Sequence, residues 1–406
     1  MPNVVFVAPF AMSATLRFAR AAAGLPGVRL GVLSQQPESM LRAQIPNLAA
    51  HRQVGNAMDV EQLVAGVRAL APALGGEVDT MVGILEQAQE PIAAARTRLG
   101  LPGMSVEATK NFRDKSRMKD LLRAHDLPCA RHALVGTAAE GEAFAQRTGF
   151  PLVVKPPAGA GAKNTFRVDD ATQLRQCLQA VPPSPARPVL IEEFIVGREY
   201  SYDAVSLGGQ HLFHSISEYY PSPLEVMETP WIQWCVLLPR EIDGDEFAPI
   251  RDAAPRALSA LGMDTGMTHT EWFRREDGSI AISEVAARPP GAQFVTLLSL
   301  AHDLDFYRAW AQLMVFGSFD PPERQWSVGV AFLRGQGSGN VVAIRGVEEA
   351  RREIGSLIVE AKLPQRGQTP AGSYEGEGYV ILRHPETQVV KDGLARLVTL
   401  LRVELG

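Results

Sequence analysis

Cysteine, lysine and long apolar runs are all scarce in this 406-residue sequence. Three cysteines, an odd number, provide no disulfide framework and are typical of a reducing compartment. No apolar stretch reaches the roughly 18 residues of a membrane-spanning helix, and the opening residues, Met1 to Ala8, lack the basic segment of a signal peptide. We therefore predict a cytoplasmic protein without a membrane partner.

Basic runs are missing as well. Forty lysines and arginines oppose 45 acidic residues, which gives a formal net charge of −5, and no basic cluster provides a footprint for nucleic acid. Apolar residues at 46% and charged residues at 21% are typical of a globular chain. The sequence therefore predicts a folded protein of about two to four domains that acts on small molecules and binds no nucleic acid.

Several catalytic signatures are absent too. No Gly-x-Ser-x-Gly nucleophile elbow occurs. No glycine fingerprint of a nicotinamide-binding domain follows the first apolar run, which disfavours an oxidoreductase, and no Walker A loop occurs. His125, Cys129 and His132 have metal-like spacing, but a fourth zinc ligand is missing, so we predict a surface segment there.

The order of the apolar segments predicts the organisation of the chain. Runs at 4–8 and 28–33 flank an Ala/Leu/Arg-rich stretch, and this strand–helix–strand order predicts an α/β domain. A charged helix is predicted from Asn111 to His125. Two hairpins are predicted farther on, at 200–220 and 268–285.

Lysines gather in one part of the chain, because five of the seven fall between positions 110 and 163. Lysine is a common phosphate ligand, and Lys155 ends an apolar strand, which places its stem in partly buried surroundings. A loop with Gly159 and Gly161 follows and could wrap phosphates with backbone N–H groups. The alternatives are a strand-end lysine that extends into solvent and a loop that is only a flexible connection.

The second hairpin carries the strongest physical argument. If Asp277 and Gly278 form a two-residue turn, Glu271 lies directly opposite Glu284, with Cβ atoms about 4.5–5.5 Å apart. Like charges in such a pair destabilise a sheet unless a cation lies between them. Mg²⁺ is the natural candidate, since it takes one or two carboxylates together with substrate phosphates. The alternative is a longer turn that shifts the register and leaves both acids in solvent.

In this order the motifs resemble those of the ATP-grasp superfamily, and in particular its carboxylate–amine ligases, among them the bacterial L-amino-acid ligases that make dipeptides. The resemblance is clearest from about Val82 to Gly291. It departs at Ala286, where many relatives carry asparagine, and this leaves open whether one or two Mg²⁺ ions bind. The matching segments are Arg113–Lys119, Phe150–Pro156, Leu190–Ser201, His269–Phe273 and Ser283–Pro289.

The resemblance implies an α/β and α+β multidomain protein with the ATP-grasp fold. We expect a Rossmann-like N-terminal α/β domain at 1–107 and an ATP-grasp domain at 108–310. The latter would contain a small lid subdomain at about 130–198 and a central antiparallel sheet. A C-terminal subdomain would occupy 311–406.

The resemblance also implies roles for individual residues. The ATP phosphates would lie beneath the 159–165 flap, and the nucleotide, the metal and the acyl group would each have their own ligands. The phosphates would contact Lys115, Lys155, Gly159 and Gly161; adenine would contact Glu192, Glu193 and Ile195; ribose would contact Glu199; Mg²⁺, or Mn²⁺ in its place, would bind Glu271 and Glu284; and Arg288 and His269 would be catalytic with Lys155.

The implied activity is that of an ATP-dependent, ADP-forming carbon–nitrogen ligase. It would make an acyl phosphate and then an amide from a small carboxylate, an amino acid or a related acid, and an amine. A homodimer would be in keeping with such ligases. The alternatives are a ligase with another acceptor, such as a thiol or hydroxyl, and a nucleotide-binding sensor without turnover.

Overall fold

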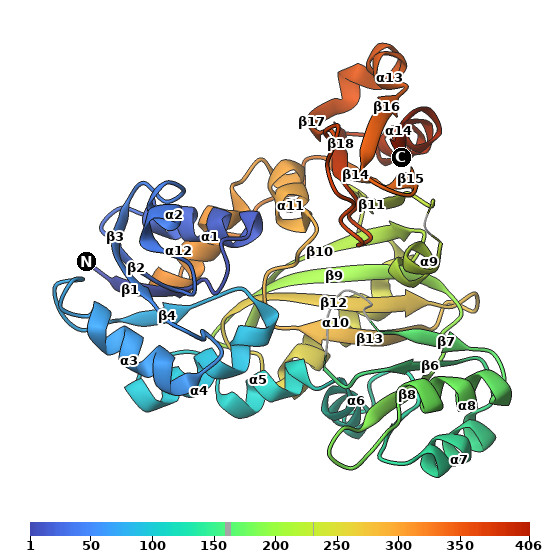
Figure 1. Ribbon diagram of the computed structural model, residues 1–406, viewed down its shortest axis with the longest axis horizontal. Helices are drawn as coiled ribbons and strands as arrows, with labels where there is room; N and C mark the ends of the chain where they lie inside the picture. The colour runs from blue at the N-terminus through green and yellow to red at the C-terminus, as the bar shows by residue number, and fades with distance from the viewer. Residues whose placement is uncertain (159–163, 230) are drawn as a thin grey trace.

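The computed structural model describes residues 1–158, 164–229 and 231–406. Gly159 and Gly161, which were expected to wrap phosphates, lie outside the described residues. Figure 1 shows an eight-stranded sheet at the centre, with an N-terminal α/β unit on one side, a small sheet with two helices below and the C-terminal elements above. Within the described ranges, no helix is both long enough and apolar enough to span a bilayer.

The N-terminal unit is built on a four-stranded parallel sheet in the order β3-β2-β1-β4. Every residue of β1 is buried, as expected of a parallel strand covered on both faces. This confirms the α/β unit that the apolar runs predict. Its elements are β1 (Asn3–Val7), α1 (Ser13–Ala23), β2 (Arg29–Ser34), α2 (Glu38–Arg42), β3 (Leu48–Gln53), α3 (Val60–Leu70), β4 (Thr80–Val82) and α4 (Gln89–Leu99).

Two short helices lead from this unit into the small sheet. The predicted helix from Asn111 to His125 is in fact a pair, α5 (Val106–Arg113) and α6 (Lys115–Ala124). They separate at Asp114, whose extended backbone ends α5 and whose side chain accepts hydrogen bonds from the backbone N–H groups of Ser116 and Arg117. This cap fixes the start of α6, and with it the position of the lysines on its first two turns.

The small sheet and its two helices lie within the predicted lid subdomain, and residues 132–158 and 164–193 are called the lid below. Its strands are antiparallel, in the order β5-β8-β6-β7, and α7 and α8 pack against them over a core of their own. The elements are β5 (His132–Val135), α7 (Ala138–Thr148), β6 (Leu152–Lys155), β7 (Phe166–Val168), α8 (Ala171–Ala180) and β8 (Val189–Glu193).

The central sheet is antiparallel, in the order β13-β12-β9-β10-β11-β14-β18-β17. The first predicted hairpin is confirmed: Leu207 pairs with Gln210 across Gly208 and Gly209, which both have positive φ. The elements from here to the second hairpin are β9 (Arg198–Leu207), β10 (Gln210–Tyr220), α9 (Pro223–Glu228), β11 (Trp234–Leu238), α10 (Ala248–Leu261), β12 (Gly266–Arg274) and β13 (Ile280–Ala286).

The C-terminal residues extend the same sheet, because β14 pairs with β11 and β18 pairs with β14. Before they do so, the chain returns to the N-terminal unit (Figure 1). There the rings of Tyr307 and Trp310 each lie 4.9 Å from that of Phe18. The domain boundaries given above stay predictions. The remaining elements are α11 (Phe294–His302), α12 (Phe306–Phe316), β14 (Ser327–Leu333), β15 (Gly335–Gly337), β16 (Val341–Arg345), α13 (Val347–Ile354), β17 (Ile358–Lys362), β18 (Gly378–His384), α14 (Thr387–Leu400) and β19 (Arg402–Leu405).

Candidate active site

Glu271 and Glu284 pair directly across β12 and β13, as predicted, but the hairpin achieves this by a different route. The predicted two-residue turn is wrong: the loop has three residues, 276–278, and the backbone N–H of Arg275 donates to the carbonyl of Ser279 at 2.8 Å. This shifts the strand pairs nearest the turn by one residue. Ser283 then bulges out of β13 and restores the predicted pair.

The bulge at Ser283 is hydrogen-bonded to α6. Its carbonyl accepts a hydrogen bond from Nζ of Lys119 at 2.5 Å, and the Lys119 side chain is fully buried. The neighbouring backbone N–H of Ile282 donates to the carbonyl of Pro128 at 2.8 Å. The register that brings the two glutamates together therefore depends on contacts outside the hairpin, and Lys119 is a structural member of the site that the sequence did not single out.

Lys115, at the first position of α6, lies against the same hairpin. Its Nζ donates to Oε1 of Glu284 at 2.7 Å, and the two side chains are largely buried. Burial alone would raise the pKa of Glu284, but the ammonium groups of Lys115 and Lys155 and the guanidinium of Arg288 lower it below its usual value. Glu284 is therefore an anion held by cations from three separate parts of the chain.

Glu192 on β8 joins the two remaining lysines of this cluster. Its Oε2 lies 2.9 Å from Nζ of Lys155 on β6, and its Oε1 lies 3.4 Å from Nζ of Lys119. Burial opposes ionisation of Glu192, but the two lysines hold its pKa below the usual range. Oε1 is buried beside its ion-pair partner Lys119 and accepts no well-aligned hydrogen bond from any described residue.

Three further carboxyl groups and a histidine line the sheet beside Glu284. Nδ1 of His269 lies 2.6 Å from Oδ1 of Asp203 on β9, and its Nε2 lies 3.7 Å from Oε1 of Glu271. Burial alone would lower the pKa of His269, but Asp203 and Glu271 raise it to about 9, so the ring is an imidazolium at neutral pH. Burial and the Glu271 carboxylate raise the pKa of Glu199 well above its usual value.

Arg288 closes the site from the side of the N-terminal unit. Its Nε donates to Oε2 of Glu86 at 2.6 Å, and the other oxygen of Glu86 accepts from Arg113 at 2.5 Å. Burial alone would lower the pKa of Arg288, but Glu86 and Glu284 raise it. Nothing in the local sequence around Glu86 indicated this pairing, because 202 residues separate the partners.

The other predicted residues lie at the edge of this cluster. Glu193 pairs with Arg131 at 2.5 Å and lies 3.7 Å from Arg275, and Ile195 follows β8 with its side chain half-buried.

The metal-like trio of His125, Cys129 and His132 does not converge on one point, since Cys129 Sγ contacts the carbonyl of Lys119 and His132 contacts Asp120. In the part of the chain that the structure describes, no three His, Cys, Asp or Glu side chains form a metal cluster.

We expect Lys119→Met to lower the free energy of unfolding by about 1–3 kcal/mol, because the Ser283 carbonyl loses its buried donor and Glu192 loses one of two cations. The midpoint of urea unfolding should fall with an unchanged m value. Lys110→Met is the matched control, since Lys110 is exposed and pairs with an exposed Glu107; we expect it to shift stability by less than about 0.5 kcal/mol. Equal midpoints for the two variants would contradict the structural role of Lys119.

Comparison with known proteins agrees with this architecture. Residues 120–302 match the ATP-grasp domain. The chain is 28% identical over 297 residues to the uncharacterized protein y4rH of Sinorhizobium fredii (strain NBRC 101917 / NGR234), which covers 70% of this chain and 59% of that protein. It is 26% identical over 278 residues to the alanine–anticapsin ligase of Bacillus subtilis (strain 168), which covers 63% of this chain and 58% of that enzyme. The chain therefore spans less than two thirds of the length of these curated relatives.

Solved structures show the same fold over the whole chain. An L-amino acid ligase from Bacillus licheniformis superposes with a TM-score of 0.80 and 20% identity, covering 100% of this chain and 99% of that one. N5-carboxyaminoimidazole ribonucleotide synthetase from Thermotoga maritima gives a TM-score of 0.73 and 17% identity, with both chains fully covered. The predicted ATP-grasp fold and the resemblance to L-amino-acid ligases are confirmed.

Proposed function

We propose that this chain, which carries an ATP-grasp domain, is an ATP-dependent carboxylate–amine ligase that acts on an amino acid or a related small acid. One observation supports this above all: Glu284, paired across the sheet with Glu271, is surrounded by Lys115 from α6, Lys155 from the lid and Arg288 from beyond the hairpin. Carboxylates and cations gathered at one buried place suit the transfer of a phosphoryl group, where charge moves between oxygens.

The proposed reaction has two steps. An oxygen of the substrate carboxylate bonds to the γ-phosphorus of ATP as the bond from that phosphorus to the bridging oxygen of ADP breaks. The amine nitrogen then attacks the acyl carbon, phosphate leaves with the electrons of the carbon–oxygen bond, and the nitrogen loses a proton. No covalent bond to the protein is required, in keeping with a sequence that lacks a nucleophile elbow.

In this proposal the lysines bind the transferred charge. Lys115 and Lys155 contact phosphate oxygens, and Lys155 is positioned for this by Glu192 at 2.9 Å. Burial would lower the pKa of Lys155, but Glu192 and Glu284 raise it, so the side chain stays an ammonium. Arg288 faces the acyl group, held in orientation by Glu86.

The donor set fits Mg²⁺, with Mn²⁺ as a second option. Glu271 and Glu284 offer paired carboxylate oxygens, the ligands that these hard cations prefer, and two opposed carboxylates need positive charge between them. The bound ion would polarise phosphate oxygens. His269, fixed by Asp203, orients Glu271 from the neighbouring position on the strand.

The nucleotide base and ribose would lie at the end of β8 and the start of β9. One oxygen of Glu192 accepts no well-aligned hydrogen bond from the described residues, and Glu193 and Ile195 follow it along the end of β8, where the base would lie. Glu199 is the second residue of β9 and would face the ribose. The raised pKa of Glu199, caused by burial and by Glu271, makes it a group that gains from a nearby hydrogen-bond donor or cation.

The proposal predicts that ADP is released from Mg-ATP only when a suitable acid and amine are both present. The measurement is ADP release against a panel of amino acids and small acids, singly and in pairs, with the product identified by mass. An amide product would support a carbon–nitrogen ligase, whereas a thioester or ester would replace the amine by another acceptor. Bound ATP without release across the panel would contradict the ligase and favour a sensor.

A further inference from the structure

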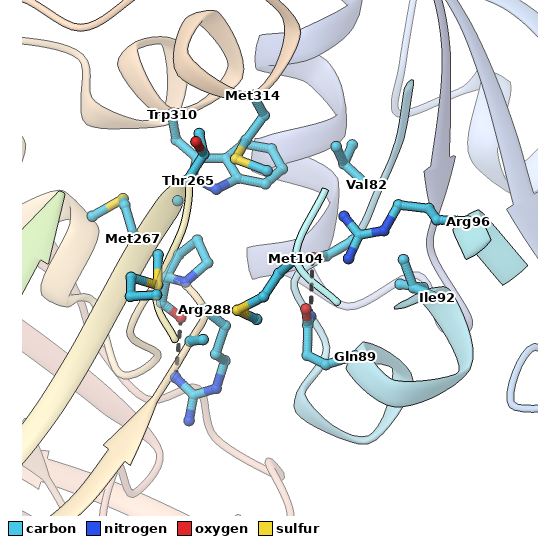
Figure 2. A pocket seen from close by; sticks show the side chains of 15 residues that line it. Val82, Gln89, Ile92, Arg96, Met104, Thr265, Met267, Arg288, Trp310 and Met314 are labelled. Atoms are coloured by element: carbon cyan, nitrogen blue, oxygen red, sulfur yellow. Dashed lines mark hydrogen bonds between the residues drawn. The ribbon is translucent and has the colours of Figure 1, made fainter. Parts of the chain in front are cut away.

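A pocket lies where the N-terminal unit meets the central sheet, next to the site described above. Figure 2 shows that it is enclosed by β4, α4, the start of β12 and α12. Four methionines, Met104, Met263, Met267 and Met314, line it together with Trp310. Thioether side chains are flexible and adapt to apolar ligands, so this narrow pocket can widen around one.

One charged group beside this wall, Arg96, forms no ion pair within the described residues, and Asp264, whose carboxylate acts on its charge, is exposed and does not line the pocket. Arg96 on α4 is 7% exposed, and Figure 2 shows its side chain extending from the helix toward the middle of the pocket. Its Nε is buried and donates no hydrogen bond to any residue that the structure describes. No Asp or Glu is among the described residues that line the pocket. Burial lowers the pKa of Arg96 to about 10, so the guanidinium still carries its charge at neutral pH.

The backbone makes room for this guanidinium. A Cβ atom at position 103 would lie 2.3 Å from Nη1 of Arg96, and Gly103 has a φ of +136°, which other residues rarely adopt. An unpaired buried cation costs free energy. A carboxylate would remove that cost, and it could form two parallel hydrogen bonds with the planar guanidinium.

The pocket adjoins the candidate active site. Arg288 also lines it, on the other side of Met104, and the guanidinium of Arg288 points away from Arg96 (Figure 2). A second, smaller pocket that contains Glu86 and Arg113 shares Gln89, Met104, Ala287 and Arg288 with the first. A ligand could therefore reach from the reacting group at Arg288, past the methionines, to Arg96.

We propose that one substrate of this enzyme carries a second carboxylate beyond an apolar stretch, and that Arg96 binds this distant carboxylate while the methionine wall contacts the stretch between. Arg96 is then a residue that determines substrate specificity and takes no part in phosphoryl transfer. The inference rests on the proposed ligase function. The distant carboxylate could be part of the acid substrate or part of the amine substrate.

The test measures KM and kcat for ADP release with compounds that differ only at the distant end. In the acid arm, with hydroxylamine as the amine, glutarate, adipate and L-glutamate are compared with their monoamides, L-glutamine among them. In the amine arm, 5-aminopentanoate is compared with pentylamine, each with the acids that release ADP in the panel. We expect at least one distant carboxylate to lower KM tenfold or more, and the arm in which it does so identifies the source.

Variants then assign the effect to Arg96. Arg96→Met should raise KM for the carboxylate compound at least tenfold, to the value of its uncharged analogue, while kcat and KM for the analogue stay unchanged. Arg96→Lys, which keeps a charge, should recover part of the loss. Arg98→Met is the matched control, since Arg98 lies on the same helix, is half exposed and pairs with the exposed Glu61.

Two outcomes would count against the inference, and they differ from each other. A KM for ADP release that does not depend on the distant carboxylate would overturn the role of Arg96, and so would an Arg96→Met enzyme with an unchanged KM. Neither result would contradict the ligase function. No ADP release by the unmodified protein with any pair would overturn the proposed function and the inference together. A merely structural Arg96 would lower the urea midpoint of Arg96→Met without changing the KM ratio of the two compounds.

Discussion

Glu284→Gln is expected to lower ADP formation by at least about 10³-fold, because it removes one of two paired carboxylates at the centre of the proposed metal and phosphate site. Glutamine has nearly the same shape as glutamate. Its side-chain oxygen can still accept the hydrogen bond that Lys115 donates to native Glu284 at 2.7 Å. The substitution therefore separates the charge from the packing. ADP formation, circular dichroism and the urea midpoint should be measured on the same preparation.

A matched control lies on the same hairpin. Glu276 is exposed in the loop that joins β12 and β13. Glu276→Gln therefore removes the same charge as Glu284→Gln, but outside the group of cations around Glu284. We expect it to retain full turnover. Near-normal turnover of Glu284→Gln, with an intact fold, would show that the proposed metal site is misassigned.

Lys155→Met should lower ADP formation by about 10²–10³-fold, because a cation that contacts the transferred phosphoryl group would be lost. It should also lower the free energy of unfolding by up to about 3 kcal/mol, since Glu192 is buried and would keep only Lys119, at 3.4 Å. A fall in activity alone could therefore reflect a damaged fold.

The double variant Lys155→Met with Glu192→Gln separates these two effects. Removing the carboxylate as well should recover part of the lost stability, because the Glu192 charge no longer stays buried with too few cations, although the buried Lys119 then keeps only the Ser283 carbonyl. Activity should stay low, since the phosphate ligand is still missing. If activity returned together with stability, Lys155 would be only a structural partner of Glu192.

The hairpin shows how far the sequence could specify the site. Strand alternation and the Asp277-Gly278 pair were enough to place Glu271 opposite Glu284, and the structure has that pair. Yet the turn is one residue longer than predicted, and Ser283 compensates by bulging. The bulge depends on Lys119 and Pro128, which come from elsewhere in the chain, so no local pattern could reveal it.

The partners that orient the charged groups were beyond sequence reasoning for the same reason. Lys155 and Arg288 were identified, but the groups that hold them, Glu192 from another strand of the lid and Glu86 from the N-terminal unit, were not assigned to them. Arg96 was not singled out, because an arginine is normally a surface residue. Its burial follows only from tertiary structure, because α4 packs against α3 and α5 and borders a pocket that residues of β12 and α12 also line.

The pairing of β14 with β11 has a consequence for the growing chain. All five residues of β11 are buried in the finished sheet, yet the neighbour that covers one edge is translated about 90 residues later. Until Ser327–Leu333 leaves the ribosome, β11 is an open, apolar edge, the kind of strand on which aggregation begins. A nascent chain that ends before residue 327 should therefore need chaperone protection, whereas the parallel sheet of the N-terminal unit contains strands that are all complete by residue 82.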